Sequence, residues 1–288
     1  MMTEFNIGGL TVVEGEAGMP PGRLYFNDLG DWYTGAESKT DIHERPQGDG
    51  ANGMEDDWRA AAVFTFTGWF EGETWADTLR MIDTFNGAVV RRKLAPVTVT
   101  DDLRSTTRIV SVRSSPIRED KFSKSFTFAI DMLAPDPLRY GPDVPESIGL
   151  PTSGGGIVYP VTYPIGYGAA GYPGQITVSN PGTAGTYSLL EITGGLAGGF
   201  ELTEVTTGQV IRFERPIPAG STVYLNPRTG RASIDGQSDV SGYLTRSEWW
   251  SVPAASGGIP GSRVVQFNAI GAATGTPTLT ARTAPAYW

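Results

Sequence analysis

Apolar and polar residues alternate along several short stretches of the chain, and the clearest of these runs from residue 124 to residue 133. One face of this stretch carries large apolar side chains, namely Phe126, Phe128, Ile130 and Met132. A period of two is typical of a half-buried strand. Pro135 and Pro137 then end the pattern, because proline has no N–H for a ladder and keeps the preceding residue out of helical geometry. We therefore expect the last strand of a domain here.

The same alternation, less regular, predicts further strands in the first half of the chain. They are expected at residues 5–13, 23–29, 61–70, 88–93, 97–100 and 107–113. From Thr74 the period changes, and apolar residues recur at helical spacing at Trp75, Leu79, Ile82 and Phe85. Thr74 can cap the N-terminus, and Asn86-Gly87 suits a left-handed stop. We expect one amphipathic helix of about three turns against a sheet, with Trp75 in the core.

The second half of the chain begins with a segment in which Pro, Gly and Tyr interrupt every apolar run. This segment, residues 142–174, is interpreted as a linker and edge segment. Strands then recur at the spacing of a sandwich, as QITVSN, TYSLLEIT, GFELTEV, QVIRFE, STVYLN, RASID, RVVQFNA and TPTLTAR. The segment from Asn226 to Gly230 has the proline and glycine of a hairpin turn.

Composition agrees with a fold made mainly of strands. The 288 residues include 38 glycines and 21 prolines, which favours many turns over long helices, and the length allows two domains. We predict a mainly β fold. Its first domain, residues 1–141, is expected to be a β-sandwich or α+β domain with one helix, and its last, residues 175–288, a β-sandwich.

Charge and cysteine content exclude several classes of protein. The net charge is −9 and the pI near 4.7, which disfavours specific nucleic-acid binding. The basic cluster Arg91-Arg92-Lys93 is interpreted as a solvated strand start. Cysteine is absent, so disulfides and thiolate metal sites are excluded. No apolar run approaches the roughly 20 residues of a membrane span, and no export signal is recognised, so synthesis in a cytoplasm without membrane insertion is expected.

Catalytic and cofactor motifs are weak or out of context. Residues 166–171 match GxGxxG, but Pro164 precedes them and no helix pattern follows. His43, the single histidine, lies in a polar segment without a nucleophile motif. Residues 49–53 lack the ligand spacing of a calcium loop. The acidic pairs Asp56-Asp57 and Glu44 with Asp49 are interpreted as an acidic surface rather than a glycosidase site. We predict no catalytic residue, no cofactor and no metal.

Three aromatic residues could form a sugar platform, namely Tyr243, Trp249 and Trp250. Neighbours in a strand point to opposite faces, so at most one of the two tryptophans is expected to be exposed. No cluster of Asn, Arg, His and Glu is visible beside them. We therefore expect the second domain to be structural, with weak sugar affinity.

The polar, glycine-rich residues 33–57 are too long for a tight turn. Two interpretations stay open for them, a mobile insertion or an arm that contacts a neighbouring subunit.

Two motifs in the expected order resemble the siphophage distal tail proteins, also called minor tail proteins. The first is KSFTFAIDMLAPDPLRYG from Lys124 to Gly141, and the second is TVYLNPRTGRASIDGQSDVSGYLTRSEWW from Thr222 to Trp250. The segment GLPTSGGGIVYPVTYPIGYG between them is also similar. The resemblance implies a first domain that forms a six-fold ring beneath the tail tube. It also implies a second domain with a jelly-roll fold, similar to galectins or carbohydrate modules, that projects outward.

The function implied is that of a non-enzymatic structural component of the virion tail tip, forming a ring that joins the tail tube to the baseplate or host-recognition apparatus. The partners implied are further copies in a hexamer, the tail tube protein, the tail hub or tail-associated protein, and the tape-measure protein. DNA passes through such a ring, and an acidic lumen would repel its phosphates. The alternative is a carbohydrate-binding adhesin that contacts the host surface through Trp249, Trp250 and Tyr243. A two-domain hydrolase is disfavoured because the candidate acids are scattered.

Overall fold

The computed structural model describes residues 2–16, 18–39, 47, 49, 58–90, 94–152, 154 and 171–288. The chain divides into two compact units. Unit 1 consists of Met1–Gly141 together with Tyr287–Trp288, and unit 2 consists of Pro142–Ala286. That residues 1–141 and 175–288 fold independently stays a prediction.

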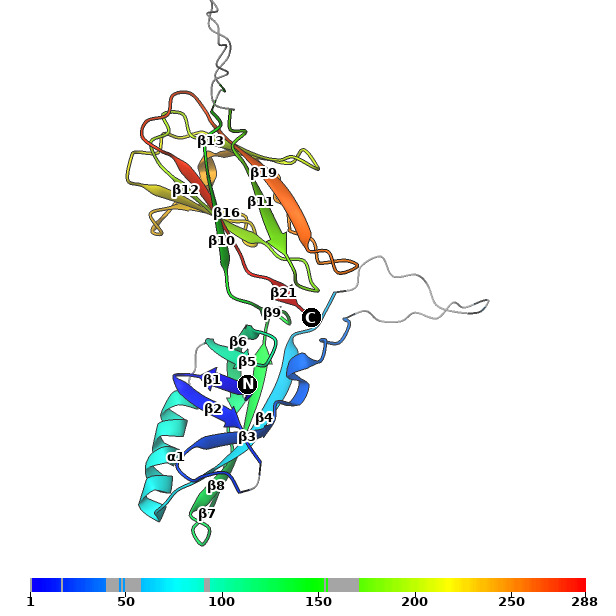
Figure 1. Ribbon diagram of the computed structural model, residues 1–288, viewed down its shortest axis with the longest axis vertical. Helices are drawn as coiled ribbons and strands as arrows, with labels where there is room; N and C mark the ends of the chain where they lie inside the picture. The colour runs from blue at the N-terminus through cyan, green and yellow to red at the C-terminus, as the bar shows by residue number, and fades with distance from the viewer. Residues whose placement is uncertain are drawn as a thin grey trace, which may run out of the picture. The chain divides into compact units, whose positions relative to one another are not determined.

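Unit 1 is built around a closed barrel of seven strands (Figure 1). The strands are β1 (Glu4–Ile7), β2 (Leu10–Glu14), β3 (Leu24–Asp28), β4 (Ala62–Glu71), β5 (Ala95–Thr100), β6 (Ser105–Ser114) and β8 (Ser125–Ala134). Their order around the barrel is β6-β5-β1-β2-β3-β4-β8, and β8 pairs back to β6. All of these pairs are antiparallel except β2 with β3.

The predicted fold class is wrong. The first half is neither a β-sandwich nor an α+β domain, because β6 changes partner along its length. Its first part pairs with β5 from Ser105 to Val110, and its last part pairs with β8 from Ser111 to Ser114. A strand that bridges two neighbours closes the sheet on itself. Alternation identifies each strand but not its partners, so closure could not be predicted from the pattern.

The barrel interior is filled mainly by aromatic rings. Phe64, Phe66 and Phe70 of β4 alternate inward with the outward Thr65 and Thr67. The ring of Phe66 lies 4.8 Å from that of Phe5. Rings at these separations stabilise the fold by roughly 0.5–1.5 kcal/mol per pair beyond the effect of their buried area. The alternation along β4 confirms the strand predicted at residues 61–70.

The helix α1 (Trp75–Val89) packs against the barrel and contacts β8. Thr74 and Asp77 form a capping box at its start, as the position of Thr74 predicted. The ring of Phe85 lies 4.8 Å from that of Phe128. The helix does not end at Asn86-Gly87 but continues to Val89, because Ala88 and Val89 are buried against the barrel.

Other details of unit 1 also differ from the predictions. Leu79 is 45% exposed and Trp75 half-buried, so the buried stripe is formed instead by Thr78, Phe85, Ala88 and Val89. The predicted strand at 5–13 is a hairpin, because Gly8 and Gly9 adopt positive φ between β1 and β2. Residues 88 and 89 are helical rather than the start of a strand, and residues 91–93 lie outside the described residues. Three short elements were not predicted, η1 (Gly30–Tyr33), β7 (Ile117–Asp120) and β9 (Arg139–Tyr140).

Unit 2 contains two antiparallel sheets. The six-stranded sheet has the order β10 (Val144–Gly149), β20 (Thr278–Thr283), β12 (Ser188–Thr193), β15 (Thr222–Asn226), β16 (Arg231–Ile234) and β17 (Ser238–Asp239). The five-stranded sheet has the order β11 (Gln175–Asn180), β19 (Gly261–Ala269), β13 (Phe200–Glu204), β14 (Val210–Phe213) and β18 (Leu244–Ser247). The strand β21 (Ala286–Tyr287) lies beside β9, and η2 (Ser241–Tyr243) precedes β18.

Both sheets of unit 2 contribute to one hydrophobic core. Leu190 and Ile192 come from the first sheet, and Leu202 and Phe267 from the second. All eight strands predicted after residue 174 are present, whereas β10, β17, β18 and β21 were not predicted. β10 lies in the segment interpreted as a linker and edge, and it is an edge strand. The jelly-roll, galectin-like class assigned to this half is not what the structure supports; unit 2 contains these two antiparallel sheets.

Candidate functional site

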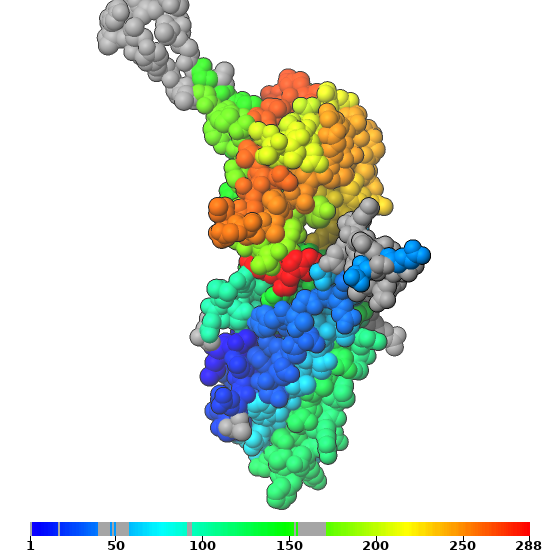
Figure 2. All heavy atoms as spheres, turned by 90° about the vertical axis from the view of Figure 1, so that its right-hand side faces the viewer, coloured from blue at the N-terminus to red at the C-terminus, as the bar shows by residue number. Residues whose placement is uncertain are grey.

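The turn between β7 and β8 presents a large apolar side chain to solvent. Phe122 is 97% exposed at this turn. The Asp120 carboxylate accepts hydrogen bonds from the main-chain N–H of Phe122 at 2.9 Å and of Ser123 at 3.5 Å, which hold the turn in shape. The hairpin forms the tapered end of unit 1 in Figures 1 and 2. A fully exposed phenylalanine on an ordered turn can bind by burying its ring in an apolar pocket of a protein partner.

The same hairpin carries an open sheet edge. Among the described residues, β7 pairs with β8 alone, through Ile117↔Phe128 to Asp120↔Ser125. The outer edge of β7 therefore has main-chain groups available to a further strand. The charged side chains of Arg118 and Glu119 on this strand would discourage unspecific pairing while still allowing a matched neighbour.

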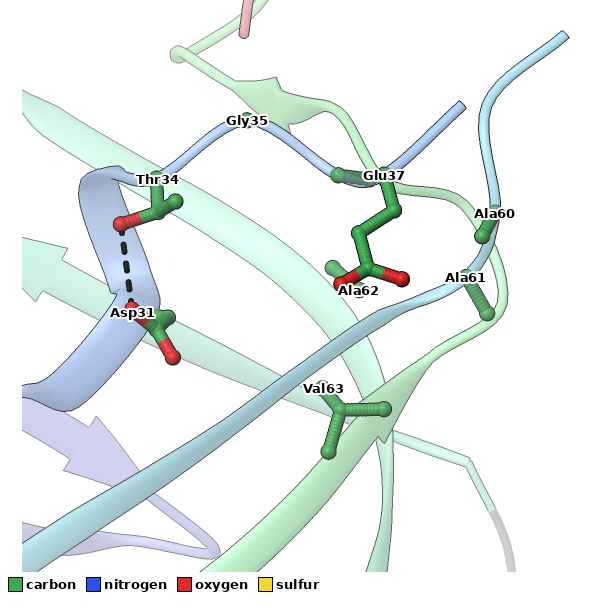
Figure 3. Close-up of a pocket in the computed structure, with 9 residues that line it drawn as sticks. Asp31, Thr34, Gly35, Glu37, Ala60, Ala61, Ala62 and Val63 are labelled. Atoms are coloured by element: carbon green, nitrogen blue, oxygen red, sulfur yellow. Dashed lines mark hydrogen bonds between the residues drawn. The ribbon is translucent and has the colours of Figure 1, made fainter. Parts of the chain in front are cut away.

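A hollow of about 380 Å³ lies on another part of unit 1, and it is lined in part by the first residues of the segment 33–57 that was predicted to be an insertion or an arm (Figure 3). It is bounded by Thr34–Glu37 and Ala60–Val63, which are joined by a hydrogen bond from Ala60 N to Glu37 O of 2.8 Å. Figure 3 shows the Glu37 side chain directed into the space between the two segments. Alanines and Val63 make its floor apolar, and Asp31 and Glu37 make its rim acidic. Such a hollow suits a small apolar side chain with a basic neighbour.

An aromatic and arginine cluster holds one end of the barrel together. The Tyr33 hydroxyl donates to Asp101 Oδ2 at 2.9 Å, and the guanidinium of Arg139 lies 5.0 Å from the centre of the Tyr33 ring. Partial burial, and then the bond to Asp101, raise the pKa of Tyr33 to about 12. Arg104 lies 4.1 Å from the centre of the Tyr287 ring, and Arg139 donates to the main-chain oxygen of Trp288. The last two residues of the chain, Tyr287 and Trp288, are thus attached to unit 1.

The three aromatics considered for a sugar platform differ in how much of each ring is exposed. Trp250 is 5% exposed and belongs to the core of unit 2, and Trp249 packs partly buried against that core. Tyr243 is 45% exposed, with Arg215 4.7 Å from its ring centre. Only Tyr243 offers an exposed ring, so a sugar site built from all three stays an untested prediction.

Several residues weighed from the sequence lie outside the described residues. They are His43, Glu44, Asp56, Asp57, Arg91, Arg92, Lys93 and residues 166–170. Over the described part of the chain, no group of three or more His, Cys, Asp or Glu residues is placed to hold a metal ion.

None of the helices in the described ranges has both the length and the apolar character needed to cross a membrane.

Comparison with known proteins gives structural matches only. No protein-family model matches the chain. No curated protein sequence matches it either. The SPP1 Dit (gp 19.1) protein, described as a paradigm of the hub adsorption apparatus in phages that infect Gram-positive bacteria, is similar over 99% of both chains, with a TM-score of 0.65 and 13% identity. A chain of the phage P2 baseplate, in its activated conformation with Ca, is similar over 99% of this chain and 97% of that one, with a TM-score of 0.52 and 10% identity.

The chain therefore has the fold seen in phage tail hub and baseplate proteins. The match to Dit in particular extends through both units, and the identity of 13% makes it a likeness of fold. The sequence resemblance to distal tail proteins rests on motifs in both units, the first ending at Gly141 and the second spanning Thr222 to Trp250.

Proposed function

We propose that this protein is a structural component of a phage tail tip that joins the tail to the baseplate or host-recognition apparatus. The observation that carries the proposal is the similarity of fold to SPP1 Dit over 99% of both chains, because it includes both units and their order. Fold alone does not define function. The distal-tail motifs at Lys124–Gly141 and Thr222–Trp250 supply the additional, sequence-level support.

Within this function, unit 1 is proposed to form a closed ring, most simply a hexamer located at the virion tail tip. A ring with one subunit type needs two different surfaces on each subunit that fit each other. Unit 1 offers the Phe122 turn, the open edge of β7 and the hollow beside Val63 as distinct surfaces of this kind. The tail tube protein, the tail hub or tail-associated protein and the tape-measure protein are the proposed neighbours.

The proposed role is architectural and requires no reaction. The net charge of −9 fits a ring through which DNA passes without being bound, because like charges repel. The galectin-like character of unit 2 and the number of six subunits in the ring are implied by the sequence resemblance. The structural comparison does not support either of them.

The test measures the mass and shape of the particles that the purified protein forms. Multi-angle light scattering at tens of micromolar, followed by negative-stain microscopy, should give closed rings of about six subunits. A chain that stays monomeric in solution and is also absent from rings in tails assembled with its tube and hub partners would refute the proposal. Assembly with partners is included because ring closure can require a template.

A further inference from the structure

A groove of about 340 Å³ lies on the outer face of the six-stranded sheet of unit 2. Its floor is formed by Tyr224 and Asn226 of β15, Arg231 and Ser233 of β16, and Leu189 of β12. Thr229 and Gln237 stand at its sides, on the turns before and after β16. None of these residues belongs to the aromatic trio that the sequence indicated.

Strand alternation places these side chains together. Val223, Leu225 and Ala232 are buried in the core, so Tyr224, Arg231 and Ser233 project from the opposite face of the sheet. In the ladder Tyr224 is opposite Ser233 on one side and Glu191 on the other. Asn226 is opposite Arg231. Paired residues on one face lie about 5 Å apart, within reach of a single ligand.

The turns that flank the groove are held in fixed conformations. Asn226 Oδ1 accepts from Arg228 N at 3.1 Å, and Gly230 has a φ of 66°. A side chain at Gly230 would meet the indole nitrogen of Trp249 at 3.4 Å, so Trp249 lies directly behind this turn. On the other side Asp235, with a φ of 51°, accepts from Thr222 N at 2.8 Å. The groove is therefore preformed, which lowers the entropy cost of binding.

The chemistry of the groove is mixed and electrically neutral. Arg231 Nη1 lies 3.5 Å from Asp239 Oδ2, and these are the charged residues that line the groove in the described structure, so their charges cancel. Asp239 Oδ1 also accepts from Ser241 N at 2.8 Å, and the Ser241 bonds hold the pKa of Asp239 below its usual value. The two side chains are 74% and 57% exposed, so the pair presents ionised donors and acceptors to a ligand at the edge of the groove.

We propose that this groove binds a neutral pyranose glycan. The half-buried Tyr224 ring offers a flat apolar surface for the C–H face of a sugar. The amide of Asn226, the guanidinium of Arg231 and the carboxylate of Asp239 surround it with groups that hydrogen-bond to neighbouring hydroxyls. A polyanion such as a teichoic acid is disfavoured because Asp239 neutralises Arg231. An apolar peptide is disfavoured because Leu189 and Tyr224 are the large apolar side chains in the lining.

The proposal is independent of ring formation. A tail-tip subunit with this groove would contact a neutral polysaccharide of the host surface, but the groove would be present equally in a monomer.

The experiment uses the full chain and saturation-transfer NMR. The probes are methyl glycosides of glucose, galactose, N-acetylglucosamine and rhamnose at millimolar concentration, with polyglycerol phosphate as the anionic comparison. At least one neutral glycoside should receive saturation from the protein. An oligosaccharide of the same sugar should then reduce that signal by competing for the site. Titration calorimetry with that oligosaccharide then gives the affinity of each variant.

Two variants and two matched controls locate the site. Tyr224→Ala and Arg231→Ala should each weaken binding about tenfold or more. Tyr243→Ala removes another half-exposed tyrosine of unit 2, and Arg246→Ala removes another exposed arginine paired with a carboxylate, Glu248 at 2.8 Å. Both controls should bind as the unmodified chain does. Arg231 is exposed, so its variant keeps the test valid even if Tyr224→Ala fails to fold.

Three outcomes would overturn the proposal. One is the absence of saturation for every neutral probe, and another is binding by polyglycerol phosphate alone. The third is a loss of affinity in Tyr243→Ala that is equal to the loss in Tyr224→Ala, which would transfer the site to the trio first indicated by the sequence. Ring formation measured on the same samples shows separately whether the tail-tip role holds.

Discussion

Arg108 lies inside the barrel with its guanidinium carbon 4.9 Å from the centre of the Trp32 ring, and it donates to the main-chain oxygen of Trp32 at 2.8 Å. A second N–H donates to the main-chain oxygen of Pro137, also at 2.8 Å. The side chain is 1% exposed, and burial is the main reason that its pKa falls to about 10. One arginine of β6 thus connects η1 to the chain that follows β8.

Replacing Arg108 should therefore destabilise unit 1 strongly. Arg108→Ala leaves the buried oxygen of Trp32 and the partly buried oxygen of Pro137 without their donor and opens a cavity beside Phe64, so a loss of about 3 kcal/mol is expected. Denaturant unfolding measures it. Arg118→Ala, at an exposed position of β7, is the matched control and should change the free energy of unfolding by less than about 0.5 kcal/mol. Equal effects of the two changes would contradict this role.

Tyr33 should make the stability of unit 1 fall at high pH. Its pKa is about 12 in the folded chain and 10.0 as an unperturbed tyrosine, so the folded state holds the proton more tightly. The resulting stabilisation is complete below pH 10 and is lost as the pH rises towards 12. In an ultraviolet titration of tyrosinate, the difference between the unmodified chain and Tyr33→Phe should have its step near pH 12. Asp101→Asn, which removes the neighbouring negative charge, should move that step to lower pH. A step that stays at pH 10 would refute the assignment.

The helix cap allows a test with two identical substitutions in one helix. Thr74→Ala removes the acceptor for Asp77 N and the partner of the Asp77 carboxylate, and it should cost about 1 kcal/mol. Thr84→Ala alters an exposed position in the middle of α1, where the threonine hydroxyl donates to Arg80 O of its own helix. Alanine is favoured there, so stability should be unchanged or slightly higher. Thermal unfolding distinguishes the two, and a cost at Thr84 equal to that at Thr74 would show that capping is not the cause.

Local elements could be predicted from the sequence, whereas strand partners could not. The alternation at Phe126–Met132 and the capping position of Thr74 follow from interactions within a few residues, and both predictions are confirmed. Barrel closure depends on β6 changing partner after Val110, which is a contact between distant residues. Short edge strands such as β7 and β17 carry too few residues to establish a period.

The candidate sites show the same limit. Adjacent aromatics drew attention to Trp249 and Trp250, but alternation buries Trp250 in the core. The groove around Tyr224 combines residues from three strands and two turns, so no local motif reveals it. The one available signal was the alternation of β15, in which Tyr224 and Asn226 fall on the face opposite Val223 and Leu225. The hairpin turn at Asn226–Gly230 pairs β15 with β16, which places Arg231 and Ser233 on that face as well.

Phe122 should matter for assembly but not for folding. Its side chain is 97% exposed, so Phe122→Ser should leave the free energy of unfolding within about 0.5 kcal/mol of the unmodified chain. If the hairpin turn contacts a neighbouring subunit or tail partner, the same change should reduce the ring fraction measured by light scattering at least tenfold. Leu103→Ser, at the exposed turn between β5 and β6, is the control for the loss of a surface apolar group. Equal ring fractions in the two variants would exclude a specific role for Phe122.

Tyr287 should stabilise unit 1 although it follows the whole of unit 2 in the sequence. Its ring lies 4.1 Å from the guanidinium of Arg104, and the next residue accepts from Arg139. Tyr287→Ala should therefore lower the stability of unit 1 by about 1 kcal/mol. Hydrogen exchange should show faster exchange in β6 and β9, with β11 and β19 unchanged. Tyr243→Ala removes the same type of contact, with Arg215 at 4.7 Å, and should affect amides of unit 2 alone. Unchanged exchange in unit 1 after Tyr287→Ala would mean that the ring adds nothing to its stability, and the attachment would then rest on the main-chain contact of Trp288.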